Sequence, residues 1–200
     1  MPAQTIKDIK KDIYLMLHRA QEMLDLTADA FMKSKTSKLD EAMEISKEIH
    51  RKEDDLTEAL AKMAPESGEA KAILTVPAHL EKIATSVERI IEHTRNRITH
   101  GMLFSDKAVQ ETGTLFKNAA GLLKNAGDTA ITGSKAGAEA VMTEGDKIVR
   151  MAGDFSTAHE NRLVSGECSP RLSTTYLCIL YAFEDLAWHA KETVKKLTVK

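Results

Sequence analysis

Residues 87–93 read VERIIEH and residues 183–189 read FEDLAWH, so a glutamate and a histidine recur in the same order at an offset of 96. At an offset of 99, positions 29, 43, 49, 51 and 55 hold the same residues as positions 128, 142, 148, 150 and 154. A connection about three residues shorter in the second copy reconciles the two offsets, because loops tolerate deletions. The chain is therefore predicted to consist of two tandem copies of one helical unit.

Apolar residues recur at spacings of three and four along six segments, which is the pattern of amphipathic helices. The first should run from about residue 5 to 33, the second from 39 to 63 and the third from 69 to 98. The fourth should open at residue 105, the fifth should span 134–163 and the sixth 172–197. Pro77 lies inside the third pattern and predicts a kink or a late helix start there.

Long helices joined by short turns pack antiparallel. The predicted fold class is therefore all-α, with two tandem three-helix-bundle repeats and six long antiparallel helices. The boundary is expected to give residues 1–101 and 102–200, packed as one pseudo-symmetric domain.

Composition excludes several functional classes. Charged residues make up 29% of the chain, yet the formal net charge is only −2. With no basic run broken by aromatics, nucleic-acid binding is not expected. The start of the chain lacks the continuous apolar segment of a secretory signal, so a cytoplasmic protein is expected, peripheral to a membrane at most. No nucleophile, phosphate-binding loop or His-Glu-x-x-His helix stands out, so we do not expect an enzyme.

Two acids in the first repeated motif are candidate metal ligands. Glu88 and Glu92 are four residues apart, which places them on one face of a helix within reach of a common ion. Carboxylates of this kind suit iron, manganese, magnesium or calcium. The competing interpretation is an ordinary solvated face neutralised by Arg89, Arg95 and Lys82.

The repeat extends the candidate set. Glu184 repeats Glu88 and His189 repeats His93, whereas Trp188 stands where the first copy has Glu92. Trp188 is expected to fill core or cover an interface, with capping of the incomplete second-copy site as the minor alternative. Matched acids on the second helix of each copy, Asp55 and Asp154, are further candidates, although acids at such positions more often face solvent. The predicted metal ligands are Glu88, Glu92, His93, Asp55, Asp154, Glu184 and His189.

The motifs SVERIIEHTRNRI at residues 86–98 and AFEDLAWHAKETV at residues 182–194 resemble those of the PhoU family of phosphate-signalling regulators. The two-copy layout and a proline ahead of each third helix, Pro65 and Pro170, fit the same family. The resemblance implies an all-helical cytoplasmic protein without enzymatic activity, which restrains phosphate uptake together with a membrane phosphate transporter and a sensor kinase.

The resemblance also implies metal clusters, with iron as the first expectation and zinc as a further possibility, held by the acids of the third helix in each repeat. Carried over by position, these are Glu88 and Glu92 in the first copy and Glu184 alone in the second. The leading hypothesis is thus a PhoU-like adaptor, expected to form a homodimer. The alternatives are a helical protein whose function is the bound ion, in storage or oxidation, and a structural dimerisation module.

Overall fold

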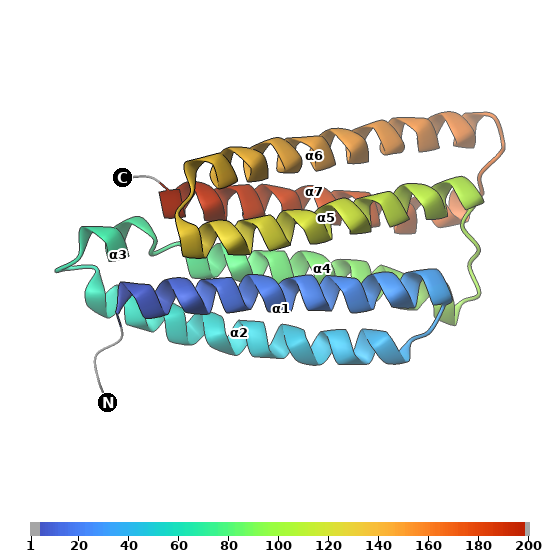
Figure 1. Cartoon of the computed structure of the whole chain (residues 1–200). Coiled ribbons are helices and arrows are strands. Elements are labelled where there is room, and N and C mark those ends of the chain that lie inside the picture. The colour runs from blue at the N-terminus through green and yellow to red at the C-terminus, as the bar shows by residue number, and fades with distance from the viewer. Residues whose placement is uncertain (1–4, 199–200) are drawn as a thin grey trace.

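The computed structural model describes residues 5–198 and is built from six long helices and one short helix (Figure 1). Within this range the helices are α1 (Ile6–Lys33), α2 (Ser37–Met63), α3 (Gly68–Ala72), α4 (Val76–Thr99), α5 (Asp106–Thr132), α6 (Lys135–Val164) and α7 (Pro170–Thr198). The predicted all-α fold class is confirmed. The expected third helix is divided into α3 and α4, and Pro77 lies in the first turn of α4, so the late start is the correct alternative.

The helix ends follow from local chemistry. Thr5 and Asp8 form a capping box at the start of α1, where the Thr5 hydroxyl accepts from the Asp8 amide at 3.2 Å and Asp8 accepts from the Thr5 amide at 2.9 Å. Ser105 caps α5 in the predicted place. Thr36 precedes α2 without a side-chain cap hydrogen bond. Gly133 ends α5 with φ of 62°, which a glycine adopts without strain.

The long helices lie nearly parallel or antiparallel in two layers. Helices α1 and α5 pack side by side in one layer, α4 and α7 pack side by side in the other, and α2 and α6 cover the two flanks (Figure 1). The central four helices therefore come from both halves of the chain. The outward faces of α5 and α7 point to opposite sides of the bundle.

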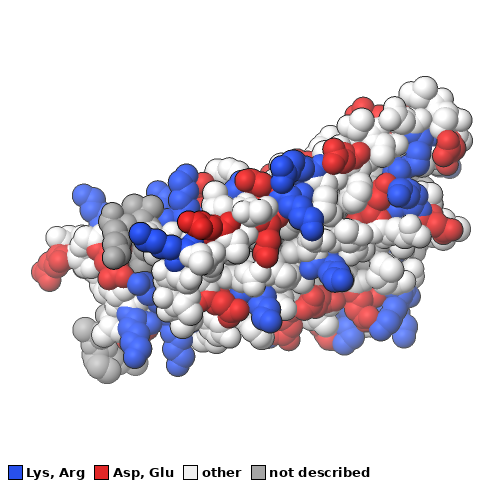
Figure 2. All heavy atoms as spheres, turned by 45° about the horizontal axis from the view of Figure 1, so that its top comes forward, with Lys and Arg blue, Asp and Glu red and all other residues white. Residues whose placement is uncertain are grey.

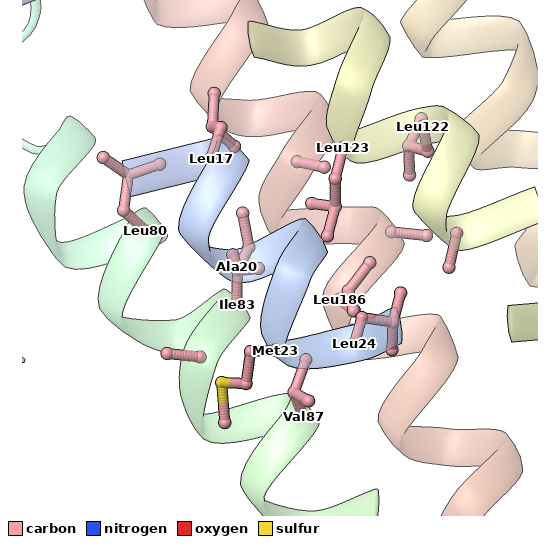
Figure 3. Close-up of a cluster of buried hydrophobic side chains, with 14 of the residues drawn as sticks. Leu17, Ala20, Met23, Leu24, Leu80, Ile83, Val87, Leu122, Leu123 and Leu186 are labelled. Carbon is pink, nitrogen blue, oxygen red and sulfur yellow. The ribbon is translucent and has the colours of Figure 1, made fainter. Parts of the chain in front are cut away.

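One apolar core joins the two layers. Figure 3 shows Leu17, Ala20, Met23 and Leu24 of α1 against Leu80, Ile83 and Val87 of α4, with Leu122 and Leu123 of α5 and Leu186 of α7 alongside. All ten side chains are buried. No helix of the described residues is both long and apolar enough to cross a bilayer. The face turned forward in Figure 2 mixes acidic and basic side chains and carries no continuous basic surface.

Candidate functional site on the α4–α7 face

The two repeated motifs lie next to each other on the outer face of α4 and α7. The Arg89 guanidinium of α4 donates to the Asp185 carboxylate of α7, and these residues hold corresponding positions in the two motifs. Both side chains are well exposed, so the pair contributes only about 0.2–1 kcal/mol to stability. The pair lies where the two halves of the chain meet on this face.

The predicted metal ligand Glu88 is engaged by α2 rather than by Glu92. Its carboxylate accepts from the Ser46 hydroxyl and lies 2.8 Å from His50 Nε2. The other ring nitrogen of His50 lies 3.5 Å from the Glu81 carboxylate, so the imidazole stands between two acids of α4. This arrangement ties α2 to α4 and engages one of the two carboxylate oxygens of Glu88.

The remaining first-copy candidates do not converge on Glu88. Glu92 and Asp55 are exposed, as is Asp154 in the second copy, and His93 is half-buried. Among residues 5–198, no group of three or more histidine, cysteine, aspartate or glutamate side chains is arranged to hold a metal ion. Zinc sites use three or four protein ligands and non-haem iron sites commonly use three, so the side chains as placed do not fit a bound metal, and the ligand set stays a prediction.

In the second copy, His189 pairs with a histidine from α4. The Nδ1 atoms of His189 and His79 are 3.0 Å apart, so one ring donates a hydrogen that the other accepts. Burial lowers the pKa of both imidazoles, and for His189 the neighbouring His79 lowers the pKa further. Both rings are therefore held neutral near pH 7. The nearby Glu184 is half-buried, and burial, with Asp185 as a second cause, raises the pKa of its carboxyl.

Trp188 covers this histidine pair from the solvent side. Its ring meets His189 edge-on with centroids 4.7 Å apart, and meets His79 in the same manner at 5.7 Å. The side chain is 50% exposed, so the expectation that Trp188 fills the core is wrong. Tyr181, two helical turns earlier on α7, is 45% exposed. Two large aromatic side chains thus face solvent on a helix whose other face is buried.

A buried polar network in the second half was not anticipated. Glu111 of α5 is only 3% exposed, and its carboxylate accepts from both terminal nitrogens of Arg162 at 3.0 and 2.8 Å. The Tyr176 hydroxyl donates to it at 2.5 Å. The His159 ring packs against the Tyr176 ring at a tilt of 51°, and its Nε2 contacts Ser173 at 3.0 Å. The network links α5, α6 and α7.

Burial and the Glu111 carboxylate shift the pKa values of the other ionisable groups in this network. The hydrogen bond to Glu111 raises the pKa of Arg162, and burial, followed by the same carboxylate, raises the pKa of Tyr176. Burial, with Arg162 as a second cause, lowers the pKa of His159. One sequence signal could have found Glu111: it lies three residues after Ala108 and four before Leu115, on the core stripe of α5, where an acid requires a buried partner.

The first half of the chain matches the sequence model of a known protein family. Residues 13–97, which cover most of α1 to α4, match the model of the PhoU domain. The first half of the chain is therefore similar to a PhoU domain. No curated protein matches its sequence.

Solved structures of PhoU proteins share the fold along nearly the whole chain. PhoU from Pseudomonas aeruginosa is 14% identical with a TM-score of 0.83, over 95% of this chain and 93% of that one. The phosphate transport system regulatory protein PhoU from Streptococcus pneumoniae is 12% identical with a TM-score of 0.83, over 96% and 92%. A PhoU-like protein from Shewanella oneidensis MR-1 is 15% identical, with a TM-score of 0.52 over 94% of both chains. At these identities the likeness establishes the fold, including the second half.

Proposed function

We propose that this protein is a regulator of inorganic phosphate uptake or signalling that works as a protein–protein adaptor. Its partner would be a membrane phosphate transporter, a sensor kinase or both, engaged from the cytoplasmic side and without catalysis. The match of residues 13–97 to the PhoU domain supports the regulatory role, and the similar Streptococcus pneumoniae protein is named a phosphate transport system regulatory protein.

One observation carries the adaptor role: Trp188 and Tyr181 stand exposed on α7 next to the Arg89–Asp185 pair. Tryptophan, tyrosine and arginine are the side chains that most often dominate binding energy in protein interfaces. Both rings are carried by a helix anchored through its buried face, so they lose little freedom when a partner covers them. This α4–α7 face is therefore the proposed docking surface.

The test compares two double variants in a strain that lacks the native gene. Trp188→Ala/Tyr181→Ala removes the aromatic surface, whereas Leu15→Ala/Ile131→Ala removes two apolar side chains of matching exposure elsewhere on the bundle. We expect the first variant to lose repression of phosphate uptake under phosphate-rich growth and the second to keep it. Both should unfold at about the wild-type temperature. Full repression by the first variant would contradict the proposed docking surface.

Metal binding is a separate proposal with its own test. Ser46 and His50 both contact Oε1 of Glu88, so an ion shared with Glu92 would bind through the other carboxylate oxygen or displace these two side chains. Metal content by plasma mass spectrometry, on untagged protein purified without chelator, is compared with that of Glu88→Ala/Glu92→Ala. Metal lost in the double variant supports the ligand assignment. A metal-free wild type, even after incubation with iron, manganese and zinc, overturns it. Homodimerisation is measured on the same sample by analytical ultracentrifugation.

A further inference from the structure

A groove runs along the outward face of α5, on the layer opposite the α4–α7 face. It has a volume of about 760 Å³ and lies between the end of α1 on one side and the middle of α6 on the other. Its lining extends from Val109 to Gly121 on α5 and includes Met32 of α1 and Lys147 of α6. This stretch is about 18 Å long, which matches three turns of a helix.

The floor of the groove is open because two glycines leave it without side chains. A Cβ placed on Gly121 would meet no atom within 4 Å, and one on Gly113 would meet only the Met32 sulfur at 3.8 Å. Packing within this chain therefore does not require glycine at either position, although each costs about 0.5–1 kcal/mol relative to alanine in a helix. Bare backbone of this kind allows a second helix to approach closely, since interaxial distance depends on the side chains at the contact.

The chemistry of the rim identifies the class of occupant. Lys117 and Lys147 flank the groove, and among the described residues neither makes an ion pair. The groove's one acid, Glu144, has both carboxylate oxygens held by the Asn125 amide at 2.9 Å. At one end the apolar Met32 is 55% exposed. The groove thus offers an apolar contact, an open floor and two lysines against one acid, so its lining is net positive.

We propose that the α5 groove binds an acidic amphipathic helix of a partner protein. The apolar face of such a helix would lie over the glycines and against Met32, and its carboxylates would reach Lys117 and Lys147. This is the helix-in-groove mode of recognition, in which burial supplies affinity and complementary charge fixes the register. The inference deepens the proposed adaptor function and rests on it: with docking surfaces on opposite layers, one molecule can hold two partners at once.

The first step of the test is site-specific photo-crosslinking in cells grown with ample phosphate. The photoreactive residue replaces Thr114, which lines the groove, or Thr157, an exposed threonine of α6 outside the groove lining. We expect position 114 to capture an acidic amphipathic segment of another protein, identified by sequencing the cross-linked peptide. Capture of a second copy of this chain, of lipid, or of nothing beyond the Thr157 control overturns the proposal.

The second step measures binding of that segment, as a synthetic peptide, to the purified full chain. Lys117→Glu/Lys147→Glu and Gly121→Met should each weaken binding at least tenfold, while Trp188→Ala/Tyr181→Ala should leave binding unchanged. If neither Lys117→Glu/Lys147→Glu nor Gly121→Met changes the affinity for the peptide, the proposed binding groove is refuted. Because the Trp188 variant is scored separately for repression, failure of the groove and failure of the proposed docking surface are distinguishable. Thermal unfolding of each variant excludes a folding defect.

Discussion

Replacing Glu111 by leucine should be far more damaging than replacing Glu111 and Arg162 together. The single change leaves the Arg162 guanidinium, whose side chain is only 13% exposed, without its carboxylate and removes the acceptor of the Tyr176 hydroxyl. Breaking a buried pair in this way costs about 3–5 kcal/mol, because an uncompensated charge stays buried. For a chain of this length the melting temperature should fall by about 6–20 °C.

The double variant Glu111→Leu/Arg162→Met removes both charges and keeps the volume apolar. Exchange of a buried ion pair for apolar side chains is often neutral or stabilising. We therefore expect the double variant to be more stable than Glu111→Leu by about 3 kcal/mol or more, with the Tyr176 hydroxyl accounting for a residual loss of about 1–2 kcal/mol.

Urea unfolding followed by far-UV circular dichroism provides the free energies of unfolding of the wild type, Glu111→Leu, Arg162→Met and the double variant, with Glu111→Gln as the isosteric control. A double variant as unstable as Glu111→Leu would refute the reasoning, because the loss would then come from packing rather than from the stranded charge. A single variant within 1 kcal/mol of the wild type would show that solvent reaches Arg162 in the native state.

Three further outcomes follow from the same structure. Gly121→Ala should raise the free energy of unfolding by about 0.5–1 kcal/mol, whereas Gly133→Ala should lower it by about 1–2 kcal/mol because of its positive φ, both measured by urea unfolding. Thr5→Ala removes half of the capping box and should cost about 1 kcal/mol by the same method, with Asp8→Ala as the companion variant. Stability should fall as pH drops below about 6.5, because His159, which is buried, and His79 and His189, which are half-buried, have folded-state pKa values below their unfolded values. The unfolded chain then binds more protons than the folded chain. Melting temperatures between pH 7.5 and 5.5 test this, and His159→Gln should flatten the profile; an unchanged profile would contradict it.

The helices could be predicted from sequence because each one carries apolar residues at spacings of three and four, which places them on one buried face. Pro77 identified the point where the third helix is interrupted, and Ser105 identified the start of α5. These signals are local, so a single segment contains all the information they need.

The site depends on contacts between segments that the local pattern does not relate. His79 and His189 are 110 residues apart, and His50 reaches Glu88 from a different helix. The apolar stripes also do not separate a core position from an open one, which is why Trp188 was expected to be covered. Spacing of four between Glu88 and Glu92 placed both acids on α4, but it carried no information about the α2 residues that engage one of them.

The different side chains at the corresponding positions 92 and 188 affect the orientation in which a partner can bind. A symmetric pair of identical three-helix units would present the same side chain at both positions, and a partner could bind in two orientations related by a half turn. Joining the units in one chain allowed a carboxylate to stand on α4 and an indole on α7. The α4–α7 face is therefore asymmetric, and a partner that covers the Trp188 indole can bind in only one of the two orientations.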